Sequence, residues 1–298
     1  MIQPIKPRRM RQLKTNLTTT VLDALRLCYV AEPRLLEDLK GIILGEKTQH
    51  NGCLLYRIKS VHFDFAYAIK DANREDIGVL YFGQQQDEDR QFVWFKVENK
   101  VLYDPDRLRE VLQFPASLGY RFDHFTAIDL AKDFSKNITY LILRMLRNPQ
   151  LTVIVNSKAV KDRKKEICHV VCGVSLDRIK KESFYVRQQK AEHDKTKGLC
   201  VTCYNKLKEI EQESSKQYIL DFYGNPKRLY RLEIHQNCAE IADFCKRQKI
   251  AQSVDLLFDK DFLTEMFYYH LGAVLRFTNK RKKIAWREIL GCNGGTIW

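Results

Sequence analysis

The stretch that most constrains the fold is FTAIDLAKDF, because it alternates like a β-strand and yet carries acids in its interior. Side chains point alternately to the two faces of a strand, so Asp129 and Asp133 share one face while Ile128 and Leu130 occupy the other. Aspartate is disfavoured in the middle of a strand. An antiparallel sheet can expose one polar face to solvent. Asp129 lies between two strongly apolar neighbours, however, which indicates a functional role for its side chain.

Two later stretches show the same arrangement. LYRLEIHQ places Arg231, Glu233 and His235 on one face, and LCVTCY ends in Tyr204. If the three strands are neighbours in one sheet, their polar faces converge on Asp129, Glu233 and Tyr204. Taken singly, each polar face is better explained as the solvent-facing side of an antiparallel strand.

Strands and helices occur in blocks rather than in strict alternation, which predicts an α+β fold. We expect a central antiparallel β-sheet that carries the active site, with flanking helices and a mainly helical C-terminal part. A helix that is interrupted before Pro33 is predicted over TTTVLDALRLCYVAEPRLLEDL. The expected segments are a basic, helical N-terminal segment at 1–50, a catalytic sheet domain at 51–238 and a basic, helical C-terminal part at 239–298.

Shorter signals place individual elements. IGVLYFG and FVWFKVEN are rich in β-branched and aromatic residues and predict paired strands. Asp104 followed by Pro105 predicts the start of a helix, since aspartate caps a helix and proline fits its first position. Asn148 and Pro149 predict the end of another helix, which begins at NITYLILRMLR.

The charge indicates a polyanionic partner. Lysine and arginine number 51 against 37 acids, a formal net charge of +14. Neutralising phosphates with such side chains releases condensed counterions, which favours nucleic acid. One basic run lies in TNKRKKIAWREIL, expected as a helix that contacts phosphate or recognises a specific DNA sequence, with a solvated basic face as the alternative. Its candidate DNA-binding residues are Lys280, Arg281, Lys282 and Lys283.

The number and spacing of the cysteines indicate the cellular compartment. Nine cysteines, an odd number without a regular framework, are typical of a reducing cytoplasm. No stretch reaches the roughly eighteen apolar residues of a membrane span. We therefore expect a cytoplasmic protein without a membrane partner.

Two cysteine pairs raise a zinc alternative. They are separated by about thirty residues, a spacing seen in structural zinc sites. In a strand, however, Cys200 and Cys203 point to opposite faces, which favours buried packing over ligation. The four residues concerned are Cys168, Cys172, Cys200 and Cys203.

Glu209 follows Tyr204 by five residues. If a helix capped by Asn205 begins there, Glu209 lies near its first turn and leans over the sheet. A cluster of carboxylates needs protons or a cation to be stable. Oxygen ligands suit Mg²⁺ or Mn²⁺, the expected cofactor.

Four segments also carry a family resemblance in order along the chain: FKVENKVLYDPDRL, FTAIDLAKDF, CYNKLKEIE and YRLEIHQN. Together they resemble motifs of the rolling-circle replication initiators of the Rep_trans type, found on bacterial plasmids and phages. SFYVR is similar to the short strand before the family's nucleophile. The resemblance runs from about Phe95 to Gln236, under half the chain. Ala127 stands where the family has arginine, and SFYVR lacks the family's glycine.

The resemblance implies a nicking enzyme. Tyr204 is similar to the family's nucleophilic tyrosine, and Asp129, Glu209 and Glu233 are similar to its divalent-metal ligands. The family nicks its origin, leaves a 3′ hydroxyl as primer and later rejoins the displaced strand. The expected DNA-binding residues at the site are Arg187, Lys206, Lys208 and Arg231.

The partners that follow are origin DNA, double-stranded or extruded as a single strand, a host helicase and a second copy of the chain. A non-enzymatic DNA- or RNA-binding regulator is the alternative, since a basic chain with aromatic strands suits binding equally well. The combination of a tyrosine with acids discriminates between them, because binding does not need it.

Overall fold

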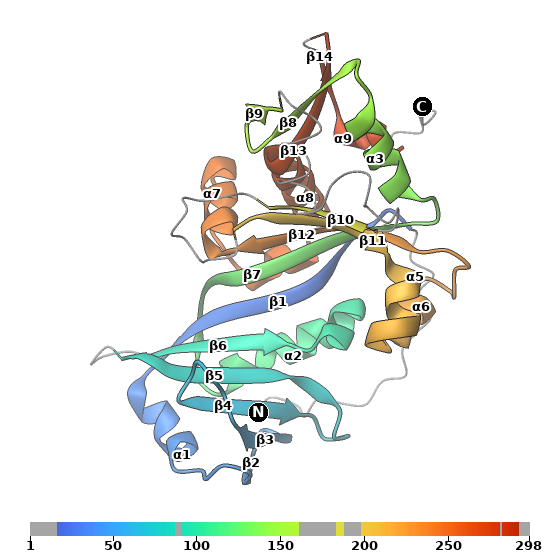
Figure 1. The fold of residues 1–298 in the computed structure, drawn as a ribbon. Coiled ribbons are helices and arrows are strands. Elements are labelled where there is room, and N and C mark those ends of the chain that lie inside the picture. The colour runs from blue at the N-terminus through green and yellow to red at the C-terminus, as the bar shows by residue number, and fades with distance from the viewer. Residues whose placement is uncertain (1–16, 87–90, 161–182, 188–197, 281, 292–298) are drawn as a thin grey trace. The chain divides into compact units, whose positions relative to one another are not determined.

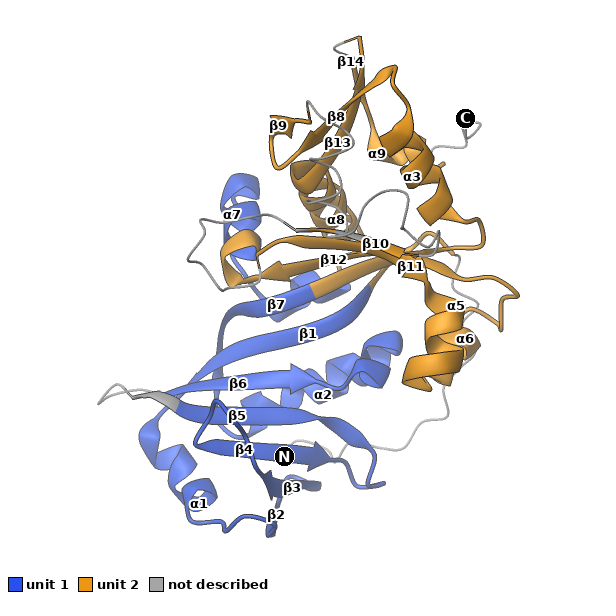
Figure 2. Cartoon of the chain, in the orientation of Figure 1, with its two compact units in different colours: residues 1–11, 22–128, 241–258 blue, residues 12–21, 129–240, 259–298 orange. Residues whose placement is uncertain are grey.

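The computed structural model describes residues 17–86, 91–160, 183–187, 198–280 and 282–291. The chain forms two compact units, shown in different colours in Figure 2. Unit 1 comprises residues 1–11, 22–128 and 241–258, and unit 2 comprises residues 12–21, 129–240 and 259–298. The boundaries of these units differ from those of the three expected segments, which end at residues 50, 238 and 298. The three segments therefore remain a prediction about domains.

Unit 1 is built on an antiparallel sheet with the strand order β7-β1-β6-β5-β4-β3-β2 (Figure 1). The expected pairing of IGVLYFG with FVWFKVEN is confirmed, with Leu80 opposite Phe95. The strands are β1 (Thr20–Ala31), β2 (Lys47–His50), β3 (Cys53–Ile58), β4 (Phe65–Lys70), β5 (Asp76–Gln86), β6 (Gln91–Val97) and β7 (Arg121–Phe134). The first residues of β1 and the last residues of β7, from Asp129, belong to unit 2.

Helix α2 (Pro105–Ser117) lies against one face of this sheet (Figure 1). Asp104 caps α2 as predicted, since its side chain accepts hydrogen bonds from the backbone N–H groups of Asp106 and Arg107. The buried residues of α2 include Leu108 and Val111. The other helical elements of the unit are η1 (Pro33–Leu36), α1 (Glu37–Lys40), η2 (Asn99–Tyr103), η4 (Val254–Phe258) and most of α7 (Cys238–Gln248).

The helix predicted at the start of the chain is wrong over residues 20–31, which form strand β1. This segment contains leucine and alanine, which favour helix locally. It nevertheless pairs with β6 from Arg26 opposite Lys96 to Ala31 opposite Gln91. Tertiary pairing therefore overrides local propensity, and helical structure begins only at Pro33.

Unit 2 contains two sheets. The first continues through β7 in the order β10-β11-β12-β7, and the second has the order β14-β13-β8-β9. Their strands are β8 (Leu151–Val155), β9 (Lys158–Ala159), β10 (Ser183–Arg187), β11 (Cys200–Asn205), β12 (Tyr230–Asn237), β13 (Leu275–Asn279) and β14 (Lys282–Ile284). The helical elements are α3 (Ile138–Arg147), α5 (Lys206–Glu209), η3, a π-helical turn (Ile210–Ser214), α6 (Gln217–Phe222), α8 (Lys260–Val274) and α9 (Trp286–Ile289).

Helices α3 and α8 pack on one face of β11 and β12. That face carries Cys203, Leu232 and Ile234, all wholly buried. The opposite face holds the polar residues of the same strands, and the candidate site lies on that face.

The C-terminal part is less helical than expected. Helix α8 ends at Val274, and Leu275–Asn279 and Lys282–Ile284 form the hairpin β13–β14, so the run expected as a basic helix lies on a hairpin. Strand β13 also pairs with β8, with Phe277 opposite Val153, so residues 275–279 belong to a sheet. The α+β fold with a large antiparallel sheet and flanking helices is as predicted. No helix in the described ranges is long and apolar enough to cross a membrane.

Candidate active site

Tyr204 lies one residue before the end of β11, where the strand gives way to α5. Asn205 caps the helix as expected, with its side chain accepting a hydrogen bond from the backbone N–H of Lys208 at 3.1 Å. This junction places Lys206 and Glu209 in the first turn after the tyrosine. The local sequence therefore brings a phenol, an ammonium and a carboxylate together.

Glu233 supplies a second carboxylate from the neighbouring strand. In the β11–β12 register Thr202 lies opposite Glu233, and Tyr204 lies opposite Arg231. The Tyr204 hydroxyl donates a hydrogen bond to Glu233 Oε2 at 2.9 Å. Both residues are half-buried. The convergence of these two polar faces, expected from the alternation, is observed.

Lys206 completes the surroundings of the tyrosine. Its Nζ donates to the Tyr204 hydroxyl at 3.4 Å and lies 2.7 Å from Glu209 Oε2. The lysine is 1% exposed, so its charge is removed from water and requires polar or charged partners, of which these are two. Glu209 Oε2 is itself buried and makes no well-directed hydrogen bond, which leaves the ammonium as its compensation.

Asp129 and His235 form a second pair on the polar face. They lie on the neighbouring strands β7 and β12, with His235 Nδ1 2.5 Å from Asp129 Oδ1. The side chains are 18% and 32% exposed, respectively. A carboxylate at Nδ1 favours the tautomer with its proton on that nitrogen and holds the ring in place.

Arg231 is not placed as expected. It and Asp133 have wholly buried side chains, joined by Nε–Oδ1 at 2.8 Å and Nη2–Oδ2 at 2.6 Å. A two-point contact of this kind fixes the guanidinium inside the unit. The expectation that Arg231 contacts DNA is wrong in this arrangement because none of its side chain reaches the surface.

The three acids expected to bind one cation have separate partners: Asp129 contacts His235, Glu233 contacts Tyr204 and Glu209 contacts Lys206. Among the described residues, they do not belong to any group of three ligand atoms within 4.8 Å of one another. As arranged here, they do not fit a single divalent ion.

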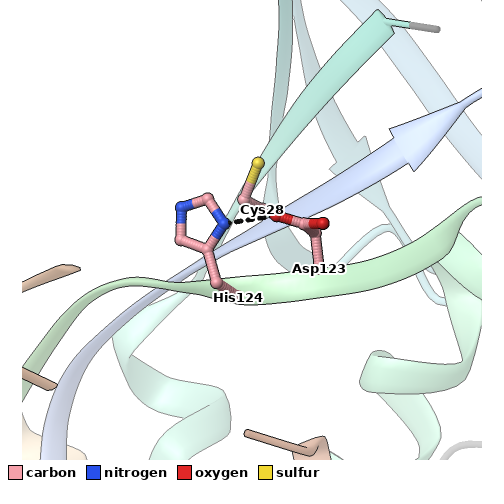
Figure 3. A group of neighbouring side chains, drawn as sticks. All are labelled: Cys28, Asp123 and His124. Carbon is pink, nitrogen blue, oxygen red and sulfur yellow. Dashed lines mark hydrogen bonds and ion pairs between the residues drawn. The ribbon is translucent and has the colours of Figure 1, made fainter. Parts of the chain in front are cut away.

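One group in unit 1 does meet that distance and was missed from sequence. Figure 3 shows Cys28 on β1 beside Asp123 and His124 on β7, with ligand atoms within 4.8 Å of one another. His124 Nδ1 lies 2.6 Å from Asp123 Oδ2. Thiolate, imidazole and carboxylate together suit Zn²⁺ better than Mg²⁺. Only the adjacent Asp-His pair was visible in sequence, since nothing linked it to a cysteine so far away.

The cysteines of β11 point to opposite faces, as expected. Cys203 is buried with Sγ 3.2 Å from Thr139 Oγ1, whereas Cys200 is half-buried on the face of Tyr204. Burial raises the pKa of the Cys203 thiol to about 12, against a smaller lowering by the Thr139 hydrogen bond. Cys203 is therefore packed as a neutral thiol. Cys168 and Cys172 lie outside the described residues.

The other expected DNA contacts differ in setting. Lys208 is half-exposed beside the site, and Arg187 ends β10 with a side chain outside the described part of the structure. Arg281 also lies outside it. Exposed lysines lie at the β13–β14 turn and on β14: Lys280, Lys282 and Lys283.

Comparison with known proteins finds similarity among solved structures only. No family model matches the chain, and no curated protein matches it. A solved structure described as a rolling circle replication initiator protein from Geobacillus stearothermophilus is similar at 12% sequence identity, covering 88% of each chain with a TM-score of 0.43.

Proposed function

We propose that this protein initiates replication by nicking one DNA strand at an origin, holding it on Tyr204 as a phosphotyrosyl ester and later rejoining it. The observation that carries the proposal is the setting of the Tyr204 hydroxyl. It lies on a half-exposed polar face, 2.9 Å from a carboxylate oxygen and 3.4 Å from a buried ammonium.

The chemistry follows from these contacts. The Tyr204 oxygen attacks the phosphorus, and its proton passes to Glu233, which already accepts it in a hydrogen bond. The bond from phosphorus to the 3′ oxygen breaks, and that oxygen takes a proton from water to become the free 3′ hydroxyl. Lys206 lies where negative charge develops on the phenolic oxygen. The ester keeps the energy of the broken bond, so rejoining needs no nucleotide cofactor.

The site is less suited to a regulator that only binds. Binding phosphate needs cations, whereas this face carries acids, including Asp129, Glu209 and Glu233. Acids facing phosphate weaken binding unless they act in chemistry or hold a cation. We therefore favour the enzyme over a DNA- or RNA-binding regulator.

A need for Mg²⁺ or Mn²⁺ remains a prediction. Because the three acids do not fit one ion as arranged, no step above runs through a metal. Asp129→Asn is expected to abolish metal-dependent cutting if Asp129 holds the ion. Glu233→Gln is expected to abolish cutting either as a lost ligand or as the lost acceptor of the tyrosine proton. Full activity of both variants in Mg²⁺ and in Mn²⁺ would remove them as ligands.

The central test is a covalent adduct. Single-stranded oligonucleotides that tile the DNA around the coding sequence are incubated with the protein and Mn²⁺, and the adduct is mapped by mass spectrometry. We expect a DNA-linked peptide that contains Tyr204, none with Tyr204→Phe, and an unchanged yield with Tyr230→Phe, a half-exposed tyrosine on β12. An adduct that persists in Tyr204→Phe rejects the assignment, and binding without any adduct supports the regulator.

A further inference from the structure

The sheet of unit 1 has a face with no assigned role. Tyr67 belongs to the covered face, where its hydroxyl donates to the backbone oxygen of Leu39 in α1. The opposite face, here called the open face, carries alternate residues of β1, β5 and β6. Trp94 on β6 lies opposite Tyr81 on β5 and opposite Cys28 on β1, which places all three on the open face.

Aromatic rings gather on the open face around Trp94. Phe63 lies 5.0 Å from Tyr81 and 5.1 Å from Trp94, and Phe92 lies 6.2 Å from Trp94, measured between ring centroids. All four are half-exposed. Such cross-strand rings stabilise a sheet by themselves. Packing within the sheet therefore explains why the four rings contact one another. It does not explain why all four remain partly exposed to solvent.

Two cations adjoin the rings. Arg26 and Lys96 lie directly opposite each other on β1 and β6, on the same face as Trp94. Both are exposed, and neither has an acidic partner among the described residues. Like charges directly opposite each other destabilise a sheet. An anion held between them would remove that cost.

The distance between the cations and the rings indicates which kind of ligand this face would suit. Lys96 is two residues beyond Trp94, about 7 Å along the strand. Asp123 lies beside Cys28, and its Oδ2 is 2.6 Å from His124 Nδ1. A row of rings followed by a pair of cations offers stacking for bases and a contact for phosphate.

We propose that the open face of unit 1 binds single-stranded DNA, with bases stacked on Trp94, Tyr81 and Phe63 and a phosphate held by Arg26 and Lys96. Paired bases inside a duplex do not present their faces for stacking, so the ligand is single-stranded. The choice of DNA over RNA rests on the proposed function, which displaces a DNA strand. The surface itself is argued independently of Tyr204.

The test measures binding of labelled oligothymidylate to the full chain by fluorescence anisotropy. Trp94→Leu is expected to weaken binding by about 5- to 150-fold, the range for loss of one stacked base. Arg26→Gln with Lys96→Gln is expected to reduce the slope of log affinity against log salt by about 1.4, from two lost phosphate contacts on a single strand. Circular dichroism melts of each variant establish that it is folded.

A matched control removes two exposed cations of unit 1 elsewhere, Lys246→Gln with Lys249→Gln near the end of α7. It should leave affinity and salt slope close to the unaltered values. Intrinsic fluorescence adds a direct readout: oligothymidylate should quench it in Trp286→Phe, whose replaced indole is buried, and not in Trp94→Phe.

The proposal is overturned if folded Trp94→Leu and the Arg26/Lys96 variant bind oligothymidylate like the unaltered chain. It is also overturned if they lose self-association instead, by sedimentation, or if the Trp94-dependent ligand is oligouridylate and not oligothymidylate. Tyr204→Phe should retain Trp94-dependent binding while losing the adduct. This separates failure of the binding surface from failure of the proposed function.

Discussion

Among single residues, the buried pair of Arg231 and Asp133 is expected to matter most for stability. Both side chains are fully buried, and the guanidinium meets both carboxylate oxygens. Asp133→Asn removes the negative charge that meets the buried guanidinium at two points, which should lower the free energy of unfolding by about 3–5 kcal/mol. Urea denaturation measures this, and a loss below about 1 kcal/mol would contradict it.

A companion variant separates charge from packing. Arg231→Met combined with Asp133→Leu removes both charges and retains apolar bulk, so it should recover much of the lost stability. If the double variant is as unstable as Asp133→Asn, shape and not uncompensated charge explains the loss.

Lys206 is expected to contribute to the reaction rather than to general DNA affinity. Its ammonium donates to the Tyr204 hydroxyl at 3.4 Å, so Lys206→Gln removes a positive charge beside the reacting oxygen. We expect the cutting rate to fall by about 10²–10³-fold, the usual effect of losing one such donor, with DNA affinity much less changed. Single-turnover cutting and anisotropy measure the two quantities separately.

Lys208→Gln is the matched control, two residues further along and half-exposed. It should weaken binding slightly and leave the single-turnover rate close to normal. Equal losses of rate in the two variants, both shown to be folded by circular dichroism, would refute a specific role for Lys206.

At the scale of elements, the hairpin β13–β14 replaces a helix expected to bind DNA. Its turn carries exposed Lys280, followed by exposed Lys282 and Lys283 on β14. Changing these three lysines to alanine should weaken origin binding and lower the salt slope by about 2.7 on duplex DNA if all three contact phosphate. Changing Lys59, Lys246 and Lys249 removes equal charge elsewhere and should have little effect. Equal effects of the two triple variants would assign the hairpin lysines to solvent.

Elements with both a local pattern and a stop signal were predictable. The strand around Asp129 and the helix capped by Asp104 formed as expected, because alternation and capping act over a few residues. Strand β1 and the hairpin β13–β14 were not predictable, since each is decided by a partner distant in sequence, β6 and β8 respectively.

The candidate site shows the same division. Alternation placed Tyr204 and Glu233 on converging faces, and the Asn205 cap placed Glu209 near the tyrosine. Three features could be found only from the folded structure: the pairing of Lys206 with Glu209, the burial of Arg231 against Asp133, and the approach of Cys28 to Asp123. Each depends on contact distances or on strand neighbours that residue spacing does not encode.

At the scale of the whole molecule, unit 2 is assembled from separated parts of the chain, including residues 12–21. Thr18 is bound twice there: its N–H donates to the backbone oxygen of Asp133 at 2.8 Å, and its backbone oxygen accepts from Lys132 Nζ at 2.6 Å. Thr20 Oγ1 lies 2.9 Å from Thr264 Oγ1. Lys132 is 4% exposed, so its charge relies on such contacts.

These contacts predict that a chain beginning at Leu22 is much less stable than one beginning at Leu17, although the two differ by only five residues. The shorter chain loses all three hydrogen bonds, and removing a partner from a buried polar group costs about 1–3 kcal/mol, more for a charged group. We expect a loss of at least about 3 kcal/mol, measured by urea denaturation. Equal stability of the two chains would show that unit 2 does not depend on this segment. An unstable shorter chain that Lys132→Met partly rescues would identify the buried ammonium as the main source of the loss.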